Sequence, residues 1–315
     1  DYQAVYDALT QLYANPLDIN TATRDELAAT YLLNERQLNS LNAYRNEYGD
    51  LLSVYELQAV PDFDLPTIRR LLPFITVSAG GRLLTKLATP TDHYVILRYE
   101  QLLEQQRGFA SATPDKNGKL PTRYVGNPQQ WYARYRYSRP RAFSLGLTLE
   151  QDPGEVMGWQ PASRRHGVDY VSFHAQLQNR GRWRSILLGD YQLQIGQGLI
   201  LSAGFVLGKS AETVQTVRRP TIGARPYTSL TEYGYFRGGT ATYALRSTID
   251  LTLLVSQNRR DANIANDANK GIIATSLQTS GLHRTQSERD DQGSLLETNI
   301  GAHVLYHNQK NTQIG

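Results

Sequence analysis

Apolar residues recur at a helical period only in the first quarter of the chain. Over residues 2–14 they are three to four positions apart, which predicts a short helix that ends at Asn15 and Pro16. The same spacing, interrupted by turn residues, predicts further helices over residues 24–31, 35–47, 54–58 and 66–72.

Polar residues at the predicted helix ends support these boundaries. Thr23 with Glu26, and Ser53 with Glu56, have the spacing of a capping box, in which a hydroxyl and a carboxylate bind free N–H groups of the first helical turn. Gly49 follows the helix over 35–47 and provides its C-terminal stop.

Beyond residue 92 the apolar period changes to two. In one segment Phe143, Leu145 and Leu147 alternate with polar or small residues. Because successive side chains of a strand point to opposite sides, such a segment has one apolar and one polar face. The same alternation is found in residues 131–138, 143–150, 171–178, 249–256 and 300–307.

The connections between these strands are of two kinds. Short turns are predicted at 138–142, 179–182 and 245–248. Long polar insertions cover about 104–129, 153–166, 207–235 and 276–297. Short turns at one end and long loops at the other are typical of outer-membrane barrels. The predicted strands also have the ~9–11 residues of a tilted membrane strand, whereas strands of soluble proteins are nearer ~5–6.

The pattern therefore predicts a mainly β chain, an antiparallel transmembrane β-barrel preceded by a small all-α module. The module covers residues 1–77, a linker residues 78–92, and the barrel strands residues 93–315. About ten strands are predicted, and the last begins a hairpin that stops at Gly315. We expect the barrel to be incomplete in this chain and its strands to continue beyond it.

Composition agrees with a membrane barrel and excludes a helical membrane protein. Although 40% of the residues are hydrophobic, no run approaches the ~18–20 apolar residues of a membrane helix. The chain has 20 Tyr, a side chain that suits a membrane–water boundary, and 0 Cys, which excludes disulfides and thiolate metal sites. Asp1 fits a mature N-terminus from which a signal peptide has been removed.

The net charge of +4 is distributed unevenly. Residues 1–77 hold 5 Arg and no Lys against 11 acidic residues, so a net charge of −6 there leaves +10 for residues 78–315. Two regions of opposite sign predict two modules with different partners.

Residues 17–77 resemble the tandem helix-hairpin-helix domain of the ComEA family of competence proteins. The matching runs are DINTATRDEL at 18–27, LNAYRNEYG at 41–49, SVYEL at 53–57 and PFITV at 73–77. The fusion of such a module to a barrel is similar to helix-hairpin-helix outer-membrane proteins of Bacteroidetes. The resemblance implies the helical fold, and DNA binding through the two hairpins.

The hairpins of this chain argue against that activity. They fall on Leu32, Leu33 and Asn34, and on Asp62, Phe63 and Asp64, with neither keeping the family's glycines. Two carboxylates repel phosphate, and residues 17–77 hold 5 Arg against 9 acids. Arg69 and Arg70 are the remaining candidates for a weak backbone contact. We therefore expect these eight residues to serve a protein partner, while DNA remains the alternative ligand.

Candidate residues of the barrel lumen are polar side chains on the predicted inward faces. Basic residues there either give the lumen an anion preference or pair with the acids and fill it. Gly189, Gly196 and Gly198 are interpreted as structural glycines that permit a kink or a close approach. The lumen candidates are Arg134, Arg136, Glu150, His174, Asp190 and Asp250.

No catalytic or metal site is predicted. His303 and His307 lie on one strand face but ~13 Å apart, too far to share an ion. Ser172 and His174 share a face without the surroundings of a phospholipase. Asp152, Asp169 and His166 are too dispersed in sequence to indicate an aspartyl protease.

The expectation is thus a non-enzymatic protein of the bacterial outer membrane without a cofactor. Its lipid-embedded barrel carries a periplasmic module that docks a protein partner in an envelope complex. DNA uptake across the outer membrane is the first alternative, and a pore for small solutes is the second.

Overall fold

The computed structural model describes most of the 315 residues. The described residues are 9, 12–13, 16–20, 22, 24–28, 30, 32–77, 92–114, 116–118, 120–139, 142–160, 165–196, 202–203, 223–267, 271–307 and 313–314. Most of the predicted helix over 2–14, the cap residue Thr23, nearly all of the linker over 78–92, and Gly198 lie outside them.

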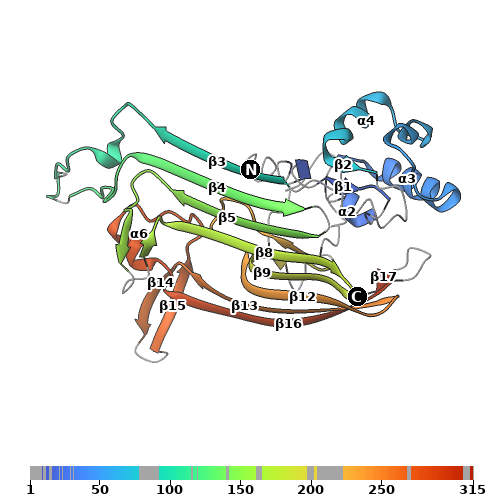
Figure 1. Ribbon diagram of the computed structural model, residues 1–315. Helices are drawn as coiled ribbons and strands as arrows, with labels where there is room; N and C mark the ends of the chain where they lie inside the picture. The colour runs from blue at the N-terminus through green and yellow to red at the C-terminus, as the bar shows by residue number, and fades with distance from the viewer. Residues whose placement is uncertain are drawn as a thin grey trace.

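A small helical module comes first, as the spacing predicted. Two short strands close it, because β1 pairs in parallel with β2 through Leu17 and Ile75. Figure 1 shows its helices gathered apart from the strands. The elements are β1 Leu17–Asp18, α2 Arg24–Ala28, α3 Glu35–Tyr48, the 3-10 helices η1 Val54–Ala59 and η2 Leu72–Phe74, α4 Leu65–Leu71, and β2 Ile75–Thr76.

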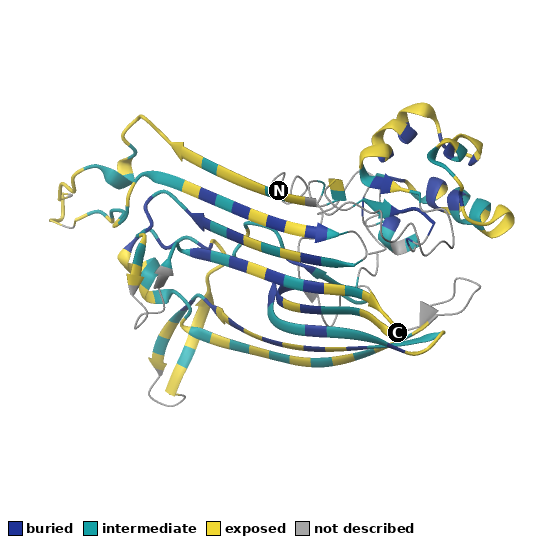
Figure 2. Ribbon diagram, viewed as in Figure 1, coloured by how far each residue is buried: buried dark blue, intermediate teal, exposed yellow. Residues whose placement is uncertain are grey.

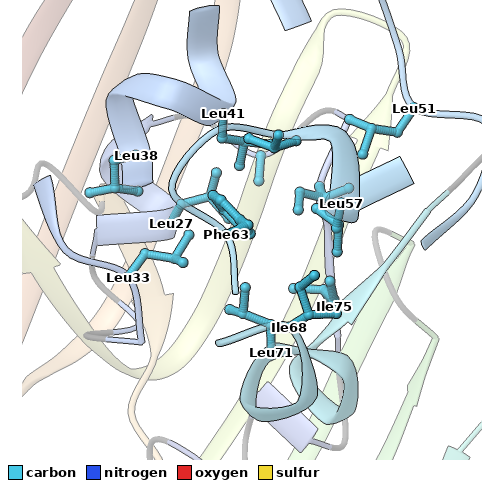
Figure 3. Packing of buried hydrophobic residues seen from close by; sticks show 13 residues of the cluster. Leu27, Leu33, Leu38, Leu41, Leu51, Leu57, Phe63, Ile68, Leu71 and Ile75 are labelled. Atoms are coloured by element: carbon cyan, nitrogen blue, oxygen red, sulfur yellow. The ribbon is translucent and has the colours of Figure 1, made fainter. Parts of the chain in front are cut away.

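The module has an apolar core of its own. Its elements are short and gain stability mainly by packing apolar faces together, since isolated helices shorter than ~12–15 residues are marginal in water. Leu51 and Leu57 are fully buried, and Leu41 nearly so. Figure 3 shows the core side chains converging from α2, α3, η1, α4 and the segments between them, among them Leu27, Leu33, Leu38, Leu41, Leu57, Phe63, Ile68, Leu71 and Ile75.

Two of the predicted helix boundaries need correction. The helix predicted over 24–31 ends at Ala28 rather than near Tyr31. The helix that follows Ser53 is a 3-10 helix, and the Ser53 side chain makes no capping bond. Glu56 instead accepts from the backbone N–H of Leu52 at 3.0 Å, so the expected capping box is wrong. Gly49 ends α3 with a φ of 86°, a left-handed conformation that glycine adopts without strain.

The second half is a large antiparallel sheet. Its spatial order is β17-β16-β13-β12-β9-β8-β5-β4-β3, with β10 and β11 also pairing with β9. The main strands are β3 Asp92–Gln101, β4 Gln129–Arg139, β5 Phe143–Gln151, β8 Tyr170–Arg180, β9 Trp183–Gln194, β12 Phe236–Arg246, β13 Ile249–Arg260 and β16 Leu295–His307. The short ones are β10 Ser202–Ala203, β11 Gly223–Pro226 and β17 Gln313–Ile314.

Short turns and long connections alternate along the sheet. Residues 140–142, 181–182 and 247–248 join neighbouring strands at one end. In the view of Figure 1 helices α2–α4 lie toward that end, and α6 with the β14–β15 hairpin lies at the other. The long connections contain η4 Arg107–Phe109, the hairpins β6 Gly158–Gln160 with β7 Arg165–Gly167 and β14 Ala262–Asp267 with β15 Gly271–Leu277, and α6 Gln286–Asp291.

Several long strands have their polar face buried and their apolar face exposed, whereas β9 buries Leu187, Tyr191 and Leu193 in an apolar cluster with Phe236 and Leu254. Figure 2 shows the alternating bands along each long strand. In β5, Ser144 and Thr148 are buried while Leu145 and Leu147 are 44% and 40% exposed. The same inversion holds in β4, β8, β13 and the exposed side of β16.

The chain is therefore mainly β and antiparallel, as predicted, but the described strands do not form a closed barrel. The path of paired strands runs from β3 to β17, and no pairing joins these two edges within the described residues. Among the helices that the structure describes, none is both long and apolar enough to cross a membrane.

Candidate functional site

The predicted lumen residues lie on the buried face of the sheet. Arg134, Arg136, Glu150 and His174 are each less than a tenth exposed. Asp190 is completely buried. The remaining candidate, Asp250, is half-buried. Its Oδ1 lies 3.5 Å from Nε of Arg184, so the two side chains form an ion pair.

Asp190 forms a two-pronged ion pair with Arg237 on the neighbouring strand. The Nε and Nη2 atoms of Arg237 donate to its two carboxylate oxygens at 2.6 and 2.8 Å. The same Nη2 also donates to the carbonyl oxygen of Val171 at 2.7 Å. Bidentate guanidinium–carboxylate contacts are among the strongest hydrogen bonds in proteins, so this pair links β8, β9 and β12 across the interior.

A row of small residues makes room for His174. In the strand register His174 lies opposite Gly146 on one side and Gly189 on the other, and Gly189 faces Gly238. A Cβ on Gly146 would lie 2.2 Å from the His174 ring, and one on Gly189 would lie 2.2 Å from a backbone oxygen. The ring Nε2 is 2.9 Å from the Oγ of Ser144. A side chain at position 189 would therefore clash with the backbone of β8, whereas nothing lies within 4 Å of a Cβ on Gly196.

Of the other histidines weighed in the sequence, only His303 has a described side chain. His303 is half-buried on β16, and His307 and His166 have side chains outside those described. Ser172 shares the buried face with His174, but the hydroxyl bound to the ring belongs to Ser144.

The hairpin residues of the module are engaged inside it. Leu33 and Phe63 belong to the apolar core and offer little surface to a partner. Asn34 caps α3 by accepting from the backbone N–H of Gln37 at 2.9 Å, and Asp64 caps α4 by accepting from that of Thr67 at 2.9 Å. These caps occupy N–H groups that a bound phosphate would need.

Charged side chains near the hairpins also make contacts within the module. Asp62, with a positive φ of 67°, accepts from the Ser40 hydroxyl at 2.7 Å and pairs with Arg36 at 2.8 Å. Arg45 donates to the carbonyl oxygens of Asn20 and Ala22. Arg69 and Arg70 lie exposed on α4, and Leu32 is half-buried.

A cluster of ionisable side chains lies in the loops at the long-connection end of the sheet. His283, which precedes α6, is its centre. Its Nδ1 is 2.5 Å from Oδ2 of Asp169, and its Nε2 is 2.9 Å from Oδ2 of Asp261. Asp169 directly precedes β8 and Asp261 directly follows β13, so side chains more than 90 residues apart in sequence meet on one ring.

Glu155 joins this cluster from the connection after β5. Its Oε1 accepts from the backbone N–H of His283 at 3.0 Å, and its Oε2 accepts from that of Asp152 at 2.9 Å. One possible ligand atom from each of Glu155, Asp169 and His283 lies within 4.8 Å of the others, and Glu155 and His283 are buried.

Burial and neighbouring charge shift the protonation of the cluster. Loss of water raises the pKa of Glu155 to about 8, with the charge of Asp169 adding to the shift. Burial lowers the pKa of His283, but its hydrogen bonds to Asp169 and Asp261 outweigh that effect and raise it to about 10. Burial, then Asp169 and Glu155, raise the pKa of Glu232 well above its ordinary value.

Sequence reasoning missed this cluster. Asp152 and Asp169 had been weighed with His166, which lies on β7, but the histidine that meets Asp169 is His283. No spacing rule links residues 155, 169, 261 and 283, because they are brought together only by the strand order. The one local signal was the capping box of Thr285 and Glu288, which predicts a helix beginning just after His283.

Comparisons with protein family models, with curated proteins and with solved structures give no significant match to this chain.

Proposed function

We propose that this chain is an outer-membrane β-barrel protein whose sheet contacts lipid through its exposed apolar face and whose helical module docks a protein partner in the periplasm. The observation that carries the proposal is the inverted polarity of β4, β5 and β8, which bury polar side chains such as Arg136, Thr148 and His174 and expose apolar ones. In water, exposing such a face would forgo roughly 25 cal/mol for every Å² of apolar surface left unburied.

Aromatic side chains at both ends of the exposed face support a membrane position. At the short-turn end Tyr137 packs on Phe143, and Trp183 packs on Tyr243. At the opposite end Tyr99 packs on Trp131 with ring centroids 4.7 Å apart. Girdles of aromatic residues flank the apolar band of membrane barrels where lipid meets water. The aliphatic residues of β5 lie between the two groups in the register.

A barrel in lipid also needs every strand edge paired, since an unpaired backbone N–H in hydrocarbon costs several kcal/mol. We therefore expect β3 and the opposite edge at β16 and β17 to be paired in the assembled protein. Short turns are periplasmic in outer-membrane barrels. Their position near α2–α4 in Figure 1 supports a periplasmic module.

A matched pair of substitutions tests the membrane position. Leu147→Arg places a charge on the exposed sheet face, and Leu52→Arg places the same charge on the module, where Leu52 is 75% exposed. In lipid vesicles we expect the first to destabilise the sheet by ~2–4 kcal/mol in urea unfolding, as Arg does near a bilayer midplane, and the second to have little effect. Equal small effects, with the wild type soluble without detergent, would refute the proposal.

Protein docking is preferred to DNA binding because the hairpin carboxylates repel phosphate and the helix caps occupy the N–H groups that phosphate would bind. An exposed surface at the end of α3 is a better candidate contact. There Tyr48, Leu52 and Tyr55 are 67%, 75% and 76% exposed, and the acids Glu47 and Asp50 are exposed beside them. Apolar anchors beside carboxylates fit a basic, partly apolar protein segment, which matches the net charge of −6 over residues 1–77.

Photo-crosslinking in the outer membrane tests this partner. A crosslinker at position 55 should give one discrete adduct whose attached peptide is rich in Lys and Arg, whereas position 43 on α3 should not. No position-specific adduct, or attachment to an acidic peptide, would contradict docking by this surface. Titration of the full chain with duplex DNA tests the alternative, and binding with a steep salt dependence would favour DNA uptake instead.

A further inference from the structure

We propose that the loop cluster binds a divalent transition-metal ion of the zinc type, with His283, Asp169 and Glu155 as ligands and Asp261 holding the imidazole from behind. The inference is independent of the membrane and docking proposals. Its geometry lies entirely in the connections that follow β5 and β13, and it concerns no residue of the polar sheet face.

The donor atoms are already gathered. One atom from each of the three ligands lies within 4.8 Å of the others, which is slightly more than twice the zinc–ligand bond length of about 2.0–2.2 Å. The Nδ1 of His283 and Oδ2 of Asp169 point at one another across 2.5 Å. A metal ion at this point would replace the proton that these two atoms share, and small side-chain rotations would bring the third ligand into contact.

Asp261 has the position of a supporting carboxylate. Its Oδ2 lies 2.9 Å from Nε2 of His283, so in the metal-bound form it would accept from a protonated Nε2 and leave Nδ1 to the ion. Asp261 is itself held, since its other oxygen accepts from the backbone N–H of Gly293 at 2.7 Å. Metal-bound histidines nearly always have such a partner on the second ring nitrogen.

Glu232 provides an independent observation. Its side chain is half-buried and packs against Gly281, where a Cβ would meet its Cβ, Cγ and Cδ atoms at 2.7–3.0 Å. Its strongest charge interactions are with Asp169 and Glu155, and no hydrogen bond or ion pair to it is found among the described residues. A third carboxyl group close to these two adds negative charge that a bound cation would offset, because buried charges are normally paired or bound to metal.

The donor set indicates the class of ion. One imidazole nitrogen with two or three carboxylates suits zinc and its neighbours, whereas calcium and magnesium favour oxygen ligands alone. The ion would link connections that belong to different hairpins of the sheet. Binding should therefore stabilise the loops at this end of the protein.

Cobalt binding tests the site directly, because Co²⁺ replaces zinc and absorbs visible light when bound by nitrogen and oxygen ligands. The full chain in detergent, first freed of metal with a chelator, should take up one Co²⁺ with a visible absorption band that excess Zn²⁺ abolishes. His283→Gln should remove the band. Asp261→Asn should retain it but weaken affinity ~10–100-fold, as loss of a supporting partner does.

Two controls keep the test decisive. His93→Gln changes an exposed histidine on β3 and should leave Co²⁺ affinity unchanged. Circular dichroism and heat-dependent gel mobility should show that each variant retains its strands. If the folded wild type gives no band, or if His283→Gln binds Co²⁺ as tightly as the wild type, the site does not exist as proposed.

Discussion

The helical module and the sheet bury opposite kinds of residue although they belong to one chain. Leu41, Leu51 and Leu57 fill the interior of the module, and its acids lie mostly outside. In the sheet Asp190 and Arg136 are buried and many leucines are exposed, although Leu187 and Leu193 lie in a small buried apolar cluster. Residues before 78 therefore bury mainly apolar side chains, whereas much of the sheet after residue 91 buries polar ones.

The difference agrees with the proposal that the two regions fold against different surroundings. An apolar core is favourable where water covers the outside, since burial removes apolar surface from water. A polar interior is favourable only if its groups bind one another and the outer surface is not in water. The ion pair of Asp190 with Arg237 and the Ser144–His174 contact meet the first condition. Lipid around the sheet would meet the second.

The largest expected effect comes from breaking the interior pair. Asp190→Asn removes the fully buried charge partner of Arg237 and leaves a half-buried guanidinium without it, which should cost as much as ~3–5 kcal/mol of sheet stability. Urea unfolding in vesicles, followed by tryptophan fluorescence, measures it. Asp290→Asn makes the same change at an exposed site on α6 and should cost little. Similar values for the two would show that the polar face is open to water.

The double variant Asp190→Leu with Arg237→Met should recover most of the loss, because neither charge is then left alone.

Truncation of an apolar side chain in the core tests the helical module. Leu57→Ala leaves a cavity in the module core, and we expect a loss of ~2–5 kcal/mol there. Hydrogen exchange of the α3 amides, read by mass spectrometry, should accelerate while the strands of the sheet stay protected. Leu52→Ala removes the same atoms from an exposed position and serves as the control. Faster exchange in the sheet as well would mean that the two regions unfold together.

A smaller effect is expected at the cap of α3. Asn34→Ala removes the side chain that accepts from Gln37 N–H and should cost ~1 kcal/mol of module stability, whereas Asn34→Ser keeps a capping oxygen and should cost less. The same exchange measurement on α3 distinguishes them. Equal protection in both variants would contradict the capping role.

The weakest effect is local and depends on pH. The folded pKa values of Glu155 and His283, about 8 and about 10, both lie above their ordinary values. A raised pKa stabilises the fold at low pH, and the contribution is lost as pH rises through the folded value. In chelator the loops should therefore loosen progressively from neutral pH to about pH 10.

The absence of native Cys allows this loosening to be observed with a single dye. A dye on Thr279→Cys, in the exposed loop before His283, should lose fluorescence anisotropy over that range, and one on Ala43→Cys in α3 should not. A rise in anisotropy at position 279 would contradict the assigned protonation.

Local patterns predicted the type of the main helices and of several long strands, but not α6 or the β14–β15 hairpin. The period of two placed the long strands β4, β5, β8, β13 and β16, because side chains alternate across any strand whatever surrounds it. Gly49 was correctly predicted to end α3, since a left-handed residue is a property of the backbone. The cap at Ser53 failed, because Ser53 and Glu56 favour a capped turn only if the following residues form an α-helix, and here they form a 3-10 helix.

Two features depended on the tertiary structure. Alternation alone is the same for a soluble sandwich and a membrane sheet, so which face is buried was decided only by the curvature and pairing of the strands. The meeting of His283 with Asp169 and Asp261 was invisible in the sequence, because side chains in different loops approach one another only when the strand order fixes the loop ends. The sequence by itself determined the local elements and the charge difference between the two regions. Contacts between distant residues are set by packing of the whole chain, and they alone decided the polar interior and the loop cluster.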